Sequence, residues 1–243
     1  NYLTEEETKL QLKTIVSPSQ DKLNTLVKLL SHTGNSNGII FCNLKDTIQM
    51  LSDFLEDKNI PHVCFYGGLE QQDRERALIK FRNGTSSLLI ATDLAARGID
   101  VPELDFIIHF QLPYKKEEFT HRNGRTARMN SNGTAYILKW KSESLPGFIK
   151  NAKEEEIESK SIEINNKWKT LFISGGRKDK ISKGDIAGLF FKQGHLTKEE
   201  LGIIELKQDC AFVAVPSCKS DELIALLNNS RLKKRKVRIS LLN

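Results

Sequence analysis

The stretch Ala91-Thr92-Asp93-Leu94-Ala95-Ala96-Arg97-Gly98-Ile99-Asp100 is the strongest local feature of the sequence, because it joins a short apolar run to a polar loop. The apolar run occupies residues 88–92, which is the length of a buried β-strand. Thr92, Arg97 and Asp100 then gather where this strand passes into a loop, and Gly98 allows the backbone to approach a ligand closely. The pattern predicts a functional loop at the end of a strand.

Strand and helix patterns alternate through the first 150 residues. Apolar runs predict four further strands, at residues 38–42, 62–66, 106–110 and 134–138. The stretches 45–58 and 70–81 carry apolar side chains at helical spacing. This alternation predicts an α/β domain, residues 1–150, with a parallel sheet covered by helices on both faces. Ligands of such sheets bind beyond the carboxyl ends of the strands.

The composition is that of an ordinary globular protein, with 243 residues of which 39% are hydrophobic and 28% charged. This length suits two small domains, and the composition excludes disordered, collagen-like and disulfide-rich proteins. The apolar runs are far shorter than the ~18 residues of a membrane span, and the acidic N-terminus is unlike a signal peptide. Four cysteines without CxxC spacing indicate that there is no metal site and that the protein is cytoplasmic, with reduced thiols.

The positive charge is concentrated in the C-terminal third. Residues 169–243 hold 15 Lys and Arg against 8 Asp and Glu, whereas the rest of the chain holds 22 against 23. A compact basic module beside a neutral one indicates binding to a polyanion, most often a nucleic acid, although solubility alone is an alternative.

The C-terminal residues predict a second domain of a different class. Residues 151–168 are polar and predict a charged helix or linker. Strands at 170–174, 202–206, 210–215 and 236–241 then enclose helices at 185–191 and 219–228. The order β-α-β-β-α-β within residues 169–243 is the split βαβ pattern of a small α+β, RRM-like domain.

A second polar motif is His121-Arg122-Asn123-Gly124-Arg125-Thr126-Ala127-Arg128. Arg125 and Arg128 stand three residues apart, so in a helical turn they share one face and can reach one ligand. Two guanidinium groups so placed suit phosphate oxygens, whereas a solvated Arg-rich turn is the alternative.

These motifs together resemble the second RecA-like domain of DEAD-box RNA helicases. Residues 91–100 are similar to motif V and residues 121–128 to motif VI. Ile39-Ile40-Phe41-Cys42-Asn43 resembles motif IV, and Gln71-Gln72-Asp73-Arg74 resembles the Gln-x-x-Arg motif. Three positions depart from the family pattern, namely Tyr66-Gly67-Gly68 for His-Gly-Asp, Asn123 for an apolar residue and Ala127 for Gly.

The resemblance implies roles for individual residues. Arg125 and Arg128 would reach the γ-phosphate of ATP, with Arg128 as the arginine finger. Asp100 would contact the nucleotide ribose, and His121 would link the nucleotide state to the other domain unless it is a packing histidine. The positions that line the RNA backbone in the family are Asn43, Gly67, Gly68, Arg74, Thr92 and Gly98. Asn43 has a second interpretation as the cap of the following helix.

The cofactor implied by the resemblance is ATP with Mg²⁺, held mainly by an N-terminal RecA-like domain in cis. The 243 residues contain neither a GxxxxGK[ST] P-loop nor an Asp-Glu-Ala-Asp box. The chain also begins without Met, so we expect a fragment that is inactive alone as an ATPase and that follows a segment carrying both motifs.

The C-terminal domain resembles the RNA-binding domain of DbpA-type helicases, through residues 171–180 and 183–186. The resemblance implies RNA as partner, specifically a hairpin of 23S ribosomal RNA in pre-50S particles. The basic residues predicted to bind it are Arg177, Lys178, Lys180 and Lys183. The resemblance is lost over residues 190–200, and it does not indicate an oligomeric state.

Two further features bear on how RNA is captured. Phe172 and Phe212 are the only aromatic residues on the two central strands and both could be core, which favours capture by a basic loop over base stacking. A second basic cluster either binds RNA or is a solvated turn; it consists of Arg231, Lys233, Lys234, Arg235, Lys236 and Arg238.

Two other functions fit the sequence. The chain could be a stand-alone RNA-binding adaptor, which a start codon just before Asn1 with no upstream P-loop in frame would favour. It could also come from a DEAD-box helicase that acts on messenger or cold-shock RNA, which competition between a ribosomal hairpin and unrelated hairpins would reveal.

Overall fold

The computed structural model describes residues 10–101, 103–127, 132–158 and 167–242. Contacts divide the chain into two compact units, Asn1–Glu70 with Ser87–Asn165 and Gln71–Ser86 with Asn166–Asn243. Helix α3 (Gln71–Arg82) therefore belongs by its contacts to the second unit. No helix in the described ranges is long and apolar enough to cross a bilayer.

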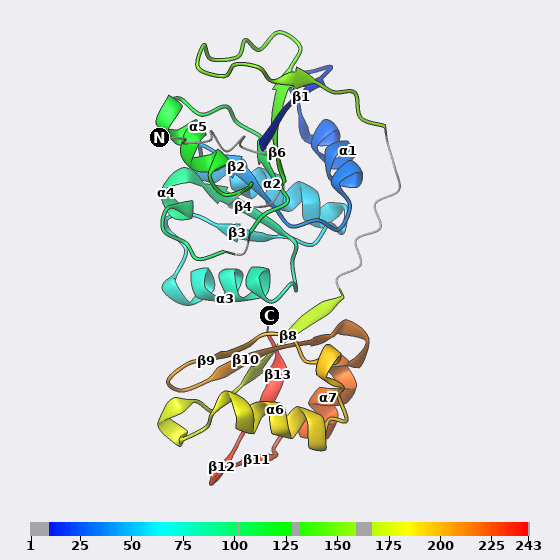
Figure 1. Cartoon of the computed structure of the whole chain (residues 1–243), viewed down its shortest axis with the longest axis vertical. Coiled ribbons are helices and arrows are strands. Elements are labelled where there is room, and N and C mark those ends of the chain that lie inside the picture. Colours follow the sequence, from blue (N-terminus) through cyan, green and yellow to red (C-terminus); the bar gives the residue numbers. More distant parts are fainter. Residues whose placement is uncertain (1–9, 102, 128–131, 159–166, 243) are drawn as a thin grey trace, which may run out of the picture. The chain divides into compact units, whose positions relative to one another are not determined.

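A seven-stranded parallel sheet forms the centre of the first unit (Figure 1). Its strand order is β3-β4-β2-β5-β6-β1-β7, and every neighbouring pair is parallel. The five predicted strands are present as β2 to β6. The bounds are β1 Leu10–Ser17, β2 Gly38–Cys42, β3 Val63–Phe65, β4 Leu88–Thr92, β5 Phe106–His109, β6 Gly133–Trp140 and β7 Lys153–Glu154.

The sheet is buried on both faces, as parallel sheets usually are. On one face, Ile40, Ile90 and Ile108 of the central strands pack with helices α1 (Leu23–Thr33) and α2 (Lys45–Asp57). On the other face, Phe119 of α5 (Lys116–Asn123) packs with Ile137 of β6. The short helix α4 (Asp93–Ala96) follows β4 directly. The predicted α/β architecture is confirmed.

Three elements of the first unit differ from the sequence prediction, namely β1, α1 and β7. Strand β1 and helix α1 lie in a stretch whose polar residues obscure its apolar pattern. Within residues 151–168, for which the sequence predicts a charged helix or linker, residues 153–154 form strand β7. Pairing with β1 explains the difference, because the Glu155 N–H donates to the Thr14 carbonyl at 3.0 Å and Lys13 forms a 2.9 Å ion pair with Glu155.

The second unit contains a four-stranded antiparallel sheet of order β13-β8-β10-β9. Chain order is β8-α6-β9-β10-α7-β13, which is the predicted split βαβ pattern. The bounds are β8 Trp168–Ile173, α6 Lys183–Lys192, β9 Ile204–Leu206, β10 Ala211–Pro216, α7 Ser220–Leu227 and β13 Ile239–Leu241. A hairpin of β11 (Arg231–Leu232) and β12 (Arg235–Lys236) precedes β13.

Residues 190–200, where the family resemblance is lost, have a packing role. Helix α6 ends at Lys192, and Leu196 then enters the core of the second unit. A 3₁₀ turn at Lys198–Glu200 follows, and its Glu200 forms an ion pair with Lys219. This segment therefore connects α6 to β9 while filling the core.

Candidate functional site

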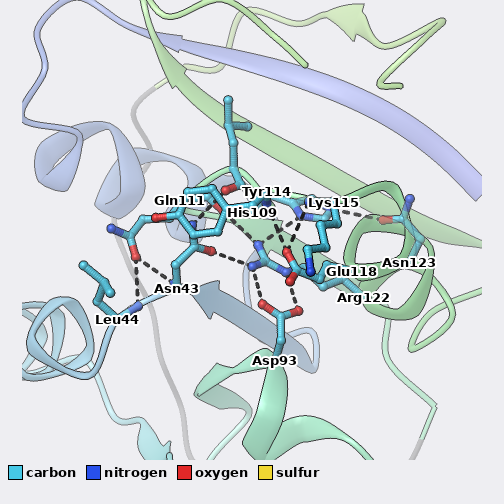
Figure 2. A network of polar contacts seen from close by, with 11 residues as sticks. Asn43, Leu44, Asp93, His109, Gln111, Tyr114, Lys115, Glu118, Arg122 and Asn123 are labelled. Carbon is cyan, nitrogen blue, oxygen red and sulfur yellow. Dashed lines mark hydrogen bonds and ion pairs between the residues drawn. The ribbon is translucent and has the colours of Figure 1, made fainter. Parts of the chain in front are cut away.

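One fully buried guanidinium organises the carboxyl end of the parallel sheet (Figure 2). Arg122 on α5 holds Asp93 through two hydrogen bonds, from Nε at 2.8 Å and from Nη2 at 2.5 Å. Its Nη2 also donates to Asn43 Oδ1 at 2.7 Å, and its Nη1 donates to the Gln111 carbonyl at 2.8 Å. A buried charge needs such complete pairing.

The partners of Arg122 come from three neighbouring strands of the sheet. Asn43 follows β2, Asp93 follows β4, and Gln111 lies two residues beyond β5. Because β4, β2 and β5 are adjacent and parallel, their carboxyl ends meet at one edge. Arg122 thereby joins the segments that resemble motifs IV, V and VI.

A buried histidine supports this guanidinium from the other side. His109 Nε2 donates to Asn123 Oδ1 at 3.0 Å, which leaves Nδ1 as an acceptor 3.5 Å from Arg122 Nη1. Burial, followed by the charge of Arg122, lowers the pKa of His109 to about 3, so the ring is neutral near pH 7. Asn123, where the family has an apolar residue, is explained by this hydrogen bond.

Asn43 does not cap helix α2. The N-cap residue is Leu44, and no side chain caps this helix end. The amide of Asn43 is instead held by Arg122 and by a hydrogen bond from Nδ2 to the Leu112 carbonyl at 2.9 Å. Of its two interpretations, the capping one is wrong.

The motif V loop meets the motif VI segment at Arg125, which lies beyond the end of α5 at Asn123 and not in the helical turn expected from the sequence. Arg125 Nη1 donates to the Ile99 carbonyl at 3.1 Å, next to Asp100, which is exposed. Gly98 has φ of +72°, a conformation that favours glycine, and a Cβ there would meet nothing within 4 Å. The loop is thus open to a ligand beside Arg125.

The structure describes the other predicted residues of these two motifs except Arg128. Thr92 ends β4, and His121 is exposed on α5. Ala127 has φ of +54°, which is a conformation that glycine, the usual family residue there, adopts without steric cost. Arg128, the predicted arginine finger, lies outside the described residues.

The turn after β3 lies at the same carboxyl edge. Gly67 is exposed, and Gly68 has φ of +106°. Lys45, the exposed first residue of α2, lies 5.4 Å from the centre of the Tyr66 ring and adds a positive charge beside this turn. Arg74 lies on α3 in the second unit, where its Nη2 donates to Gln71 at 2.8 Å.

A cavity of about 810 Å³ lies next to the buried network and shares Asn43 and Gln111 with it. Lys22 in its wall is buried, and it donates to the Phe110 carbonyl and to the Leu138 carbonyl, the latter at 3.0 Å. Burial lowers the pKa of Lys22. Its hydrogen bonds make it a structural lysine that joins the end of β5 to β6.

The first basic cluster of the second unit lies in and after a tight turn. Arg177 and Lys178 are exposed in a 3₁₀ turn, and Lys180 and Lys183 are exposed after it. Gly176 closely approaches the backbone of the chain itself, because a Cβ there would lie 2.5 Å from the Gln208 carbonyl oxygen. Gly175 and Gly176 shape the turn, and the basic side chains that follow them remain exposed.

The second basic cluster lies beside the first. Arg235 forms a 2.5 Å ion pair with Asp179 of the turn, and Lys233 forms a 2.9 Å ion pair with Asp185 at the start of α6. The backbone N–H of Gly176 and then Arg235 lower the pKa of Asp179. The structure thus brings the two clusters together, which their separation in the sequence did not reveal.

Four residues of the buried network were missed by sequence analysis, namely Asp93, His109, Gln111 and Arg122. Two signals were present: Asp93 and Arg122 stand inside the quoted motifs, and His109 ends an otherwise apolar strand. In the described part of the chain, no group of three or more His, Cys, Asp or Glu side chains is placed to hold a metal ion.

Comparisons with known proteins match both units. The model of the helicase conserved C-terminal domain matches residues 21–130, and that of the DbpA RNA binding domain matches residues 170–241. Among solved structures, the C-terminal domain of the DEAD-box protein Dbp5 is 27% identical with a TM-score of 0.50, covering 56% of this chain and 79% of that one. The Escherichia coli DEAD-box protein SrmB, bound to regulator of ribonuclease activity A, is 26% identical with a TM-score of 0.53, covering 61% and 91%.

A helicase C-terminal domain followed by an RNA-binding domain is therefore the class that fold and motifs define. Two curated relatives named ATP-dependent RNA helicase DbpA align with 92% of the chain. That of Bacillus subtilis is 27% identical with 53% of its length covered, and that of Escherichia coli is 30% identical with 51% covered. The chain belongs to the DbpA-like DEAD-box RNA helicases, and it spans about half the length of these relatives.

Removal of Asp93 should destabilise the first unit strongly. In Asp93→Ala the buried Arg122 charge loses its counter-ion, which typically costs roughly 3–5 kcal/mol. Urea denaturation measures this loss, and Asp57→Ala, at the exposed end of α2, serves as the control with little effect. A loss no larger than that of the control would mean that Arg122 is not the centre of the network.

The buried histidine predicts a pH dependence of stability. The pKa of His109 is about 3 in the folded chain and 6.5 when unfolded, so between these values the unfolded chain binds the extra proton. Stability therefore falls as the pH drops, by about 2 kcal/mol between pH 7 and pH 5 from this group alone. Denaturation at both pH values should show that His109→Asn removes this part of the loss, whereas His195→Asn at an exposed position does not. Equal losses in all three proteins would refute the assignment.

Proposed function

We propose that the complete protein is an ATP-dependent RNA helicase whose ATPase activity is stimulated by RNA. These 243 residues then supply its second RecA-like domain and its RNA-binding domain. The observation that carries the proposal is the Arg122 network, because it fixes the segments resembling motifs IV, V and VI in one rigid arrangement. The names of the two curated relatives support it.

The residues of the motif V loop fit a nucleotide chemically. Asp100 is an exposed carboxylate suited to ribose hydroxyls, and Arg125 beside it is a guanidinium suited to phosphate oxygens. We assign the ribose to Asp100 and the γ-phosphate to Arg125 and Arg128, with His121 coupling to the first RecA-like domain. Phosphoryl transfer from ATP with Mg²⁺ supplies the driving energy. The P-loop needed to hold these phosphates is not among the 243 residues, so we expect them alone to be inactive.

The carboxyl edge also suits an RNA backbone. We assign phosphate and sugar contacts to Asn43, Gly67, Gly68, Arg74, Thr92 and Gly98. Open turns at Gly67 and Gly98 support this assignment, because backbone N–H groups in such turns can approach phosphates. Lys45 adds a charge at the same edge. These contacts would position RNA without reading its sequence.

The second unit would bring the helicase to its RNA. We propose that it binds a hairpin of 23S ribosomal RNA, that the protein remodels pre-50S particles, and that it works in the cytoplasm. The adjoining basic clusters at residues 177–183 and 231–238 support RNA binding, since they present both lysine charges and planar guanidinium groups. The four cysteines are free, as a reducing compartment requires.

Loss of the proposed arginine finger should strongly reduce ATP turnover. In the complete protein, Arg128→Ala should lower RNA-stimulated ATP hydrolysis by roughly 10³-fold or more, the scale for such a residue. Lys150→Ala, an exposed charge outside the motifs, is the matched control. Steady-state turnover measures both variants, and RNA affinity should stay unchanged. Near-normal turnover of Arg128→Ala would overturn the motif VI assignment.

Hairpin recognition should depend on the type of basic residue. The chain should bind a 23S hairpin more tightly than a scrambled hairpin of equal length, with affinity falling steeply as salt rises. Charge reversal at Lys178 and Lys180 should weaken both complexes, whereas Arg177→Lys should mainly reduce the difference between them. Titrations at matched salt measure this. Equal affinities of the unmodified chain for both hairpins would leave only a non-specific electrostatic tether.

A further inference from the structure

Residues 71–86 pack on one face of the sheet of the second unit. The core-facing side chains of β8 and β10, such as Leu171 and Val213, pack with α6 and α7. Phe172 and Phe212 alternate with them and therefore lie on the opposite face. There they form a cluster with Ile79 of α3, in which Ile79 is fully buried.

The apolar contact is tight on both sides. The rings of Phe172 and Phe212 meet edge to face, with centres 5.8 Å apart. Phe212 is 6% exposed and Leu242 7% exposed. The aromatic pair that could stack on bases is therefore occupied by an aliphatic side chain of the same chain.

Polar groups around this cluster fix the position of α3. Arg82 donates to both carboxylate oxygens of Glu205 on β9 at 2.8 Å each, and Glu75 pairs with Lys207 at 2.5 Å. The hydroxyl of Thr85 lies 2.7 Å from that of the buried Thr170. A forked ion pair combined with a partly buried hydroxyl pair gives α3 one defined orientation on the sheet, which a merely apolar contact would not.

We propose that residues 71–86 are an intramolecular cap that closes the Phe172–Phe212 face to RNA bases. RRM domains use the two central strands of this sheet to stack bases on exposed rings. Here Phe212 is buried and Phe172 is partly buried beneath Ile79, so RNA held by the second unit is left with the exposed basic clusters at residues 177–183 and 231–238. Base stacking on this face requires α3 to separate from it. The RNA part of this inference rests on the proposed function, whereas the cap does not.

Cysteine reactivity tests the cap without RNA. Cys210 is partly buried against the Phe172–Phe212 cluster, and exposed Cys218 in the same unit is an internal reference. Alkylation of the full chain, located by peptide mapping, should be several-fold faster at Cys210 in Arg82→Glu than in the unmodified chain. The double variant Arg82→Glu/Glu205→Arg should restore protection, and Arg76→Glu, an exposed change on the same helix, should leave it intact.

The ion pair of Glu75 with Lys207 provides an independent repeat of this test, in case one variant does not fold. Glu75→Lys should also expose Cys210, and Glu75→Lys/Lys207→Glu should protect it again. Circular dichroism confirms that each variant is folded. Fast alkylation of Cys210 in the unmodified chain, or no change in either single variant, would overturn the cap.

Photo-cross-linking with single-stranded RNA containing 4-thiouridine tests access to the face. In the unmodified chain, cross-links should fall in the basic clusters and not at Phe172 or Phe212. In Arg82→Glu the cross-links should also appear at these rings, and the affinity for the single-stranded RNA should rise by roughly tenfold. Adding Phe172→Ala to this variant should remove the increase. Cross-links to Phe212 in the unmodified chain would overturn the proposal. Absence of all RNA binding with Cys210 still protected would count against the proposed function alone.

Discussion

The side chain of Arg122 loses its hydration when the first unit folds, and its neighbours must replace that hydration completely. Asp93 supplies the counter-charge, while Asn43, Gln111 and His109 supply acceptors. Each of these residues stands at or just beyond the carboxyl end of a strand, so the arrangement holds only in the observed strand order β4-β2-β5. One desolvated charge thereby ties sheet topology to the geometry of the loops that carry the candidate site.

The basic side chains that matter most are buried in the first unit and exposed in the second. In the first unit the key guanidinium is buried, and its work is to hold segments in place. In the second unit the basic side chains of residues 177–183 stay exposed on a short turn whose backbone is held by Lys207 and Gln208. Exposed basic side chains on a rigid turn are suited to binding a polyanion. The buried guanidinium of Arg122 is instead suited to holding chain segments in a fixed arrangement.

Local patterns were sufficient for the five central strands and for the split βαβ order, because these elements carry their apolar periodicity in unbroken runs. Strand β7 was missed because its pairing with β1 depends on residues 140 positions away, which no local pattern records. Arg125 and Asp100 could be proposed as site residues because they stand in local motifs, whereas no local motif marks His109 as part of the buried network. Its polar partner Asn123 lies on another element and appeared in the sequence only as a departure from the family pattern.

The carboxylates of Asp179 and Asp185 have a consequence for selectivity. They stand among the basic side chains and pair with Arg235 and Lys233, so part of the positive charge is already compensated before any nucleic acid arrives. A phosphate that approaches in the wrong position meets a carboxylate and is repelled, and the uniform attraction that holds any polyanion is weakened. Such a surface has a lower non-specific affinity for polyanions. An RNA whose phosphates avoid the carboxylates of Asp179 and Asp185 therefore binds more tightly than another RNA of the same charge.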